Sequence, residues 1–221
     1  SCISETSEKL ISHLDYKSIE TNKYLVCFTP EAFLQLISAF SSMFNARSII
    51  DGLSLMNEDS IGNQISVPNL NISDEGLHPK NVGAFSFDGE GTPTQNIQLV
   101  TNGILTQLLH SEATARKFGV KPTGHAGLGA KVSVSPDWLV VSKSESEMDK
   151  DESLSIKNTI KEYILIDELS AIHSGVKASQ GSFSLPFDGW IVNDGKKTSI
   201  EAATVAGDIL KVLSSILKIE D

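Results

Sequence analysis

The first strong pattern of apolar and polar positions along the chain is helical. In residues 29–44, "TPEAFLQLISAFSSMF", apolar side chains recur three and four positions apart, which places them on one face of a helix. Thr29 is a favourable N-cap, Pro30 suits the first helical position, and Glu31 places an acidic side chain in the first turn. The pattern predicts a helix that begins after Thr29 and buries one apolar stripe: Phe33, Leu36, Ile37, Phe40 and Phe44.

Alternation typical of β-strands dominates the second half of the chain. In residues 94–110, "TQNIQLVTNGILTQLLH", two alternating runs flank Asn102-Gly103. This dipeptide suits a type I′ hairpin turn, because both central residues of that turn need positive φ. A second hairpin is predicted around Asp194-Gly195. Hairpins join antiparallel neighbours, so the sheets should be mostly antiparallel.

Shorter patterns complete the expected elements. Residues 57–83 are predicted to be an extended loop with a brief strand at 64–72, and two later strands are predicted on either side of Pro136. One helix should start with Ser111 as its cap and end at Gly119 in the left-handed region. The further helices are predicted at residues 4–14, 45–52, 154–163 and from about Val205.

Together these segments predict an α+β fold with mostly antiparallel sheets and a few packed helices. Forty per cent of the residues are apolar, which is enough for a core. No internal repeat is visible, and no linker divides the sequence. We therefore expect a single domain over residues 1–221.

The net charge of −10 limits the classes of partner. Non-specific binding to a DNA backbone depends on lysine and arginine, so no direct contact with nucleic acid is expected. No apolar run approaches the roughly 18 residues that a membrane helix needs, and the first residues lack the pattern of a signal peptide. A cytoplasmic protein without membrane contact is the expectation.

Motifs for metal, nucleophilic and phosphate chemistry are missing from the sequence. None of the five histidines forms an HExxH motif or an i, i+4 pair on a predicted helix, so no metal and no cofactor are expected. There is no GxSxG nucleophile elbow and no phosphate-binding glycine loop. A hydrolytic site without zinc, using His110, His125 or Asp88, stays open as an alternative, because the sequence does not place these side chains in space.

Two glycine-containing segments are candidates for a site. In "FDGEGTPTQ", residues 87–95, a turn in which Asp88 binds its own downstream backbone is favoured over a metal loop, with a position at the rim of a cleft as the alternative. In "GHAGLGA", residues 124–130, the glycines predict a flexible loop near a groove. Glycine there would let a peptide backbone approach closely.

These segments also carry a family resemblance. The stretches "FDGEGTPTQNIQLVTNGILTQLL", "ATARKFGVKPTGHAG" and "GVKASQGSFSLPFDGWIVNDGKKTSIEAATVAGDILKVLSSI" resemble, in order and spacing, the motifs of the TldD/PmbA family, which is also named for modulation of DNA gyrase. The similarity runs from about residue 24 to the end, and "PTGHAG" is more similar to the PmbA (TldE) side. The resemblance implies the C-terminal domain of such a protein, with the N-terminal domain absent from this chain.

The resemblance also implies where zinc chemistry would lie. TldD-type members carry a His-Glu-x-x-x-His motif on a helix and a further cysteine ligand near the C-terminus. Glu31 falls at the glutamate of the motif, whereas Pro30 and Gln35 occupy the two histidine positions. Proline has no ligand atom, and a neutral amide oxygen is a poor zinc donor. Glu31 is therefore expected to be inactive, and an independent metallopeptidase is not expected.

The leading functional hypothesis follows from this resemblance. It describes a metal-free, PmbA-like subunit that pairs with a TldD-like metallopeptidase, or with itself, and helps to process unfolded peptides. A hydrolase with its own non-zinc site and a gyrase-interacting binding protein are the alternatives. The residues expected to contact substrate or a second subunit are Asp88, Glu90, Thr123, Gly124, His125 and Gly127.

Overall fold

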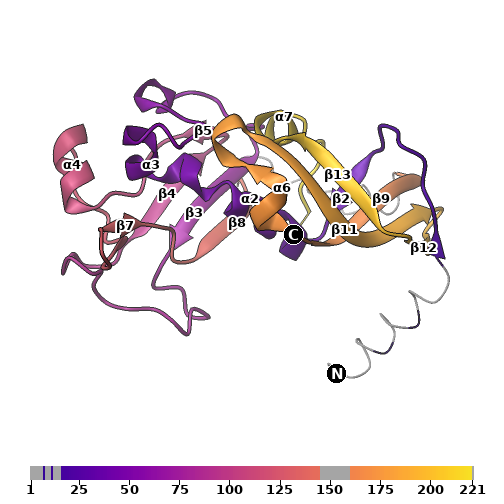
Figure 1. Cartoon of the computed structure of the whole chain (residues 1–221), viewed down its shortest axis with the longest axis horizontal. Helices are drawn as coiled ribbons and strands as arrows, with labels where there is room; N and C mark the ends of the chain where they lie inside the picture. The colour runs from indigo at the N-terminus through magenta and orange to yellow at the C-terminus, as the bar shows by residue number, and fades with distance from the viewer. Residues whose placement is uncertain (1–6, 8–10, 12–15, 145–159, 221) are drawn as a thin grey trace. The chain divides into compact units, whose positions relative to one another are not determined.

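The structure is a computed structural model of the chain (Figure 1). It describes residues 7, 11, 16–144 and 160–220. The helix predicted at residues 4–14 lies outside the consecutive described residues, as does most of the helix predicted at 154–163.

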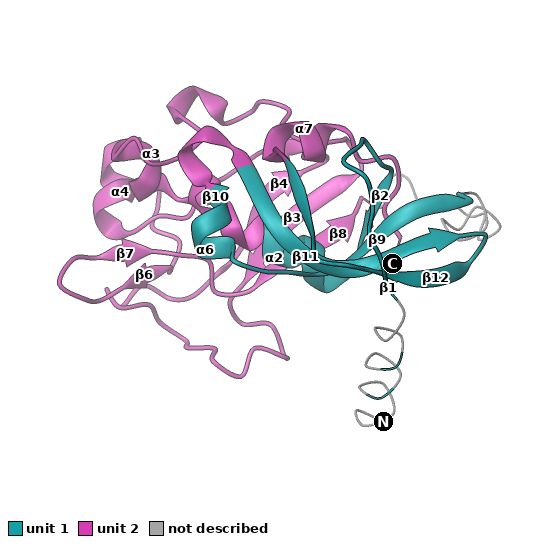
Figure 2. Cartoon of the chain, turned by 45° about the vertical axis from the view of Figure 1, so that its right-hand side comes forward, with its two compact units in different colours: residues 1–36, 149–176, 183–206 teal, residues 37–148, 177–182, 207–221 magenta. Residues whose placement is uncertain are grey.

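The chain divides into two compact units (Figure 2). Unit 1 contains Ser1–Leu36, Asp149–Val176 and Phe183–Ala206, and unit 2 contains the rest: Ile37–Met148, Lys177–Ser182 and Gly207–Asp221. Because the chain passes between the units several times, neither unit is a continuous segment. The expected single domain stays a prediction, and each unit is described by itself.

Unit 1 is built around a seven-stranded sheet with the order β1-β12-β11-β9-β2, in which β10 and β13 also pair with β11. The strands β9, β11 and β12 are antiparallel neighbours, whereas β1 and β2 join the sheet in parallel. The strands are β1 (Tyr16–Lys17), β2 (Val26–Phe28), β9 (Glu162–Leu169), β10 (Val176–Lys177), β11 (Ser182–Asn193), β12 (Lys196–Ile200) and β13 (Ala203–Asp208). The helices that begin in this unit are α2 (Pro30–Ala39) and α6 (Ile172–Gly175).

Local sequence explains how the main elements of unit 1 start and turn. Helix α2 begins at Pro30 as predicted, and its Thr29 cap accepts a hydrogen bond from the Ala32 amide at 3.2 Å. The predicted hairpin joins β11 to β12, with φ of 47° at Asp194 and 80° at Gly195. Both central residues thus have the positive φ of a type I′ turn, and this hairpin prediction is confirmed.

Unit 2 contains a four-stranded antiparallel sheet with the order β5-β4-β3-β8 and a two-stranded ribbon, β6-β7. The strands are β3 (Leu70–Glu75), β4 (Asn96–Thr101), β5 (Ile104–Leu105), β6 (Ala126–Gly127), β7 (Ser133–Val134) and β8 (Leu139–Lys143). The helices are α3 (Ala46–Ile50), α4 (Glu112–Phe118) and α7 (Ile209–Ser214), with short 3-10 turns η1 (Ser41–Phe44), η2 (Glu58–Ser60) and η5 (Ala178–Gln180). The mixed α+β class with mostly antiparallel sheets is therefore confirmed.

Several local predictions for unit 2 hold. Helix α4 is capped by Ser111, whose side chain accepts a hydrogen bond from the Thr114 amide, and it ends at Gly119 with φ of 68°. Strands β7 and β8 lie on either side of Pro136. The core gathers around η1 and the sheet, with these side chains fully or almost fully buried: Phe40, Met43, Phe44, Leu70, Ile72, Leu99, Val100, Leu105, Leu108 and Leu109.

Two predictions were wrong in detail. The brief strand expected at residues 64–72 begins only at Leu70, and it pairs with β4 and β8 on both sides, so it is a central strand. The last helix begins at Ile209 and not near Val205, because residues 203–208 pair with β11 as β13. In both places, long-range pairing outweighs local preference. Among the described residues, no helix has the length and apolar character needed to cross a bilayer.

The Asn102-Gly103 turn between β4 and β5 also has positive φ at both central residues, 50° and 78°, as predicted, so the two hairpin turns provide a matched test of close packing. A Cβ atom at Gly103 would lie 2.5 Å from the carbonyl oxygens of Ser66 and Val67, whereas a Cβ at Gly195 would meet nothing within 4 Å. Each Gly→Ala variant should lose about 1 kcal/mol in free energy of unfolding, because alanine disfavours positive φ. We expect Gly103→Ala to lose a further 1–3 kcal/mol or so through overpacking. Chemical denaturation of both variants measures the difference, and equal losses would contradict this packing.

Candidate functional site

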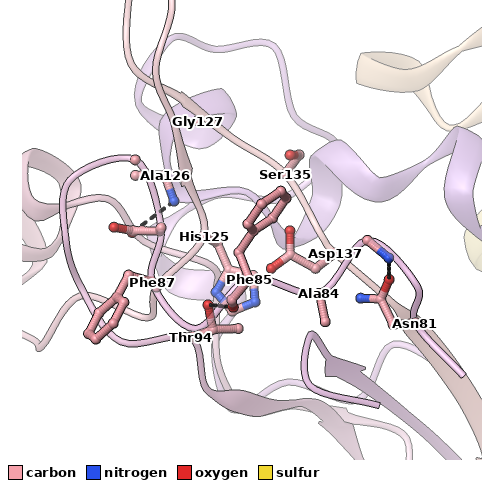
Figure 3. Close-up of a pocket in the computed structure, with 14 residues that line it drawn as sticks. Asn81, Ala84, Phe85, Phe87, Thr94, His125, Ala126, Gly127, Ser135 and Asp137 are labelled. Atoms are coloured by element: carbon pink, nitrogen blue, oxygen red, sulfur yellow. Dashed lines mark hydrogen bonds between the residues drawn. The ribbon is translucent and has the colours of Figure 1, made fainter. Parts of the chain in front are cut away.

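A pocket lies in unit 2 where two loops meet (Figure 3). One loop precedes β4 and contains the Asp88 turn, and the other runs from Gly124 through the β6-β7 ribbon to Asp137. The pocket has a volume of about 160 Å³. Its lining residues are Asn81, Gly83, Ala84, Phe85, Phe87, Asp88, Gly89, Thr94, Gly124, His125, Ala126, Gly127, Ser135 and Asp137.

Asp88 fastens the two loops together. Its Oδ1 atom accepts hydrogen bonds from the amides of Glu90 and Thr92, each at 2.9 Å, which confirms the predicted turn. Its Oδ2 atom accepts a hydrogen bond from the Ala126 amide at 3.0 Å, and the Gly89 amide donates to the Ala126 carbonyl at 2.6 Å. Because three amides hold the Asp88 carboxylate, its first role is to fix the shape of the pocket.

Glu90 points to a different place from Asp88. Its Oε2 atom accepts a hydrogen bond from the Glu112 amide at 2.7 Å, at the first residue of α4. A carboxylate there satisfies a free amide of the first helical turn and interacts favourably with the helix dipole. Glu90 does not line the pocket, so its predicted contact with substrate or a subunit stays a prediction.

The glycine loop packs closely against its own chain. Gly124 has φ of 78°, and a Cβ atom there would clash with the Pro93 carbonyl oxygen and lie 2.8 Å from the Thr94 Cα. A Cβ atom at Gly89 would lie 2.8 Å from the Ala126 carbonyl oxygen. These glycines therefore permit a close approach between the two loops of this chain, and the expected approach of a peptide backbone stays a prediction.

His125 stands at the centre of a buried polar chain. Its side chain is 0% exposed, and its Nδ1 atom lies 3.0 Å from the Thr123 hydroxyl. The same hydroxyl accepts a hydrogen bond from the His110 amide at 2.8 Å and donates to the His110 carbonyl at 3.2 Å. The Thr123 hydroxyl thus joins the His125 ring to the backbone of His110, and the tautomer of the ring sets which atom donates at Nδ1.

Asp74 is the site residue that sequence reasoning missed. It is completely buried, and its carboxylate accepts hydrogen bonds from the amides of Asp137 at 2.8 Å and Trp138 at 2.6 Å. The His125 Nε2 atom lies 3.1 Å from Asp74 Oδ2, but the ring nitrogen is not aligned for a hydrogen bond. The available signal was the alternation of β3, since Asp74 continues the buried phase of Leu70 and Ile72.

Asp137 presents an accessible carboxyl group to the pocket. Partial burial raises the pKa of Asp137, the carboxylates of Asp74 and Asp88 raise it further, and His125 acts in the opposite direction. Several acidic groups thus share a small space, and the ionised form of Asp137 is disfavoured there.

His110 has a structural setting and does not line the pocket. Its ring packs edge-on against Phe118 with centroids 5.2 Å apart, and its Nδ1 atom lies 3.2 Å from the Thr114 hydroxyl. Burial lowers the pKa of His110 to about 4. This histidine is therefore neutral in the folded protein over most of the pH range.

The positions implied for zinc belong to α2 in unit 1. Pro30 and Glu31 are exposed, and Pro30 offers no ligand atom. The Oε1 atom of Gln35 accepts a hydrogen bond from the Leu169 amide at 2.9 Å, so it already has a partner in β9. Within the described residues, no group of three or more ligating side chains is arranged for a metal. These residues do not fit zinc.

The structure brings together part of the predicted site. Asp88, Gly124, His125 and Gly127 line one pocket, and Thr123 holds His125 from behind. Glu90 caps α4, and Glu31 lies on α2 in the other unit. Substrate or subunit contact stays a prediction for all of them.

The chain has the architecture of an α+β metallopeptidase-related domain: the family model described as the PmbA/TldA metallopeptidase C-terminal domain matches residues 21–221. The chain belongs to this PmbA/TldD family, as the motifs predicted.

Relatives and solved structures agree on the family. The metalloprotease PmbA of Escherichia coli O157:H7 is 26% identical over 219 residues, covering 97% of this chain and 45% of the relative. A Thermotoga maritima crystal structure, named for modulation of a DNA gyrase, has a TM-score of 0.87 and 30% identity over 97% of this chain and 48% of its own. TldE from Thermococcus kodakarensis has a TM-score of 0.79 at 17% identity, covering 96% and 48%, and supports the fold. The chain thus spans about half the length of these relatives.

The low pKa of His110 gives a pH-dependent stability. The folded pKa of about 4 lies below the unfolded value of 6.5, so only the unfolded chain gains a proton between them. Stability is therefore present above pH 6.5 and is lost as pH falls toward 4, by on the order of 3 kcal/mol. We expect His110→Phe to flatten this dependence in urea unfolding, whereas replacement of exposed His173 by Gln should not.

Crowding of carboxylates gives a second stability prediction. Because the folded pKa of Asp137 is raised, its ionised form destabilises the fold once pH exceeds that pKa. We expect Asp137→Asn to raise the thermal midpoint at about pH 7, and the gain to shrink as pH falls toward about 4. Asp59→Asn, at an exposed position of unit 2, is the matched control. A lower midpoint for Asp137→Asn at neutral pH would contradict the repulsion.

Proposed function

We propose that this chain is the C-terminal domain of a metal-free, PmbA-like subunit that works with a TldD-like metallopeptidase subunit on unfolded peptides. Family membership supports the link to peptidases, since the relatives carry metalloprotease names. The observation that carries the metal-free role is the side chain of Gln35, whose oxygen is bonded to the Leu169 amide where the family's zinc motif has a histidine.

The division of labour has a physical basis. A subunit without zinc ligands supplies surface and pockets, and the partner supplies the metal that polarises the peptide carbonyl and activates water. In this proposal the fixed loops around Asp88 and Gly124 take part in holding the peptide or the partner. A cytoplasmic location, association into an oligomer and an N-terminal domain in the whole protein are parts of the same proposal.

The hydrolase alternative is less well supported by the geometry. The Thr123 hydroxyl lies 3.0 Å from His125 Nδ1, and His125 Nε2 lies 3.1 Å from Asp74 Oδ2 without the alignment of a hydrogen bond. In addition, the Thr123 hydroxyl is buried and bonded to both the amide and the carbonyl of His110, so it is not free to attack a substrate. Replacing His110, His125 and Asp88 without any loss of activity would remove this alternative.

Direct action on DNA has little support from the charge of −10. Binding to a nucleic-acid backbone would depend on lysine and arginine side chains that neutralise phosphates, and it would weaken steeply as the salt concentration rises. A salt-dependent shift of a DNA band at physiological ionic strength would favour this class of function.

Two measurements on the whole protein that contains this chain test the proposal. Incubated with zinc and then desalted, it should retain well below one zinc per chain, while a TldD-like protein with the His-Glu-x-x-x-His motif should retain its metal. Mixed with that partner, it should co-elute on size exclusion and increase cleavage of an unfolded peptide. One tightly held zinc per chain, peptide cleavage after chelation, or neither co-elution nor an effect on cleavage would each contradict it.

A further inference from the structure

We infer that the pocket of unit 2 is a subsite for a cationic group of the peptide, either the ammonium or guanidinium of a side chain or the N-terminal ammonium. This inference rests on the proposed function, because it names the peptide chemistry that such a subunit would hold. Nothing in the names of the relatives assigns a ligand to this pocket.

The described residues that line the pocket include two aspartates and neither lysine nor arginine. Asp137 is the carboxylate left for a ligand: its backbone amide binds Asp74, but the described residues offer no hydrogen-bond or ion-pair partner to its side chain. Asp88 adds negative charge while its oxygens are held by backbone amides. The buried carboxylate of Asp74, 3.1 Å from His125 Nε2, adds further negative charge near the pocket.

His125 supplies a second, independent indication of a ligand. Its side chain is 0% exposed, it lines the pocket, and its Nε2 atom has no hydrogen bond within the described chain. The Nε2 atom lies 3.1 Å from Asp74 Oδ2 but is not aligned with it for a hydrogen bond, so the described chain leaves this buried polar atom unsatisfied at the pocket wall. A polar group of a ligand in the pocket would give this atom a hydrogen-bond partner, and the negative charge of Asp74 beside the ring favours a cationic group.

The aromatic side chains of the pocket suit the same class of ligand. Phe85 is 77% exposed and Phe87 is 60% exposed, and both line the pocket with His125 and Asp137 (Figure 3). A cation within about 6 Å of a phenyl ring is attracted to its face, and the methylenes of lysine or arginine pack on it. The two phenyl rings would therefore contribute to the binding of a lysine or arginine side chain, whereas they would contribute little to the binding of a purely polar ligand.

Size and charge exclude the main competitors. The volume of about 160 Å³ is below the roughly 300–1,000 Å³ of ordinary small-molecule sites, so one side chain or chain end fits better than a cofactor. A neutral apolar side chain would desolvate the carboxylates without compensation, and an acidic one would be repelled.

Direct binding to short, unfolded peptides tests the inference. The probes are fluorescent Gly-Ser peptides with blocked ends and a single central lysine, arginine or norleucine, together with a norleucine peptide whose N-terminus is free. Binding to the whole protein is measured by fluorescence anisotropy at about 0.15 M salt, which screens long-range attraction. We expect the better cationic peptide to bind about tenfold more tightly than blocked norleucine, consistent with a charge-assisted contact.

Variants show whether the preference for cationic peptides arises in this pocket. Asp137→Asn should reduce the tenfold preference to about twofold or less, whereas Asp59→Asn, which removes the same charge outside the pocket, should keep it. Phe85→Ala should weaken both cationic and norleucine peptides, the cationic ones more. If the blocked lysine and arginine peptides carry the preference, the ligand is a side chain, and if only the free N-terminus does, the ligand is a chain end.

Equal binding of all four peptides, or equal losses in Asp137→Asn and Asp59→Asn, would overturn the subsite. The partner experiments separate this from the proposed function. A charge preference without any association with a TldD-like partner supports the pocket and contradicts the subunit role. Association without a charge preference supports the subunit role and contradicts the cationic subsite.

Discussion

The pocket of unit 2 depends on one buried charge, the carboxylate of Asp74. It accepts hydrogen bonds from the amides of Asp137 and Trp138, so the end of β3 is tied to the turn that leads into β8. An ionised carboxylate without exposure is stable only when such donors replace water. The same carboxylate sets the charge beneath His125 and contributes to the raised pKa of Asp137. Structure and electrostatics of the pocket therefore have a common source.

The two candidate regions show different ways of using a polar side chain. Asp88 has both oxygens committed to backbone amides, and it shapes the loops. The oxygen of Gln35 likewise accepts a hydrogen bond from the Leu169 amide, at a position where the family resemblance implies a zinc-binding histidine. Asp137 and the Nε2 atom of His125, in contrast, line a pocket without such bonds. Polar groups that the fold does not satisfy are the ones that a ligand can satisfy, and this contrast separates architecture from binding.

Much of the fold was predictable because its signals are local. The caps at Thr29 and Ser111 and the turns at Asn102-Gly103 and Asp194-Gly195 depend on the φ and hydrogen bonds of a few neighbouring residues. The central position of β3 and the pairing of β13 with β11 depend on strands far away in sequence, and there the predictions were wrong in extent. The energy of strand pairing depends on both strands, so the pattern of one strand alone does not predict where it ends or which strands it pairs with.

The sequence by itself determined the family and the turn of Asp88, and it has Pro30 and Gln35 where the resemblance implies two zinc-binding histidines, because these are matters of residue identity and order. Only the tertiary structure decided that Asp74, from β3, lies 3.1 Å from His125 and that Asp137 stands beside them at a pocket. It also decided that Glu90 serves α4 and not the pocket. The reason is physical: burial and through-space charge act between residues about 50 to 60 positions apart, and folding creates both.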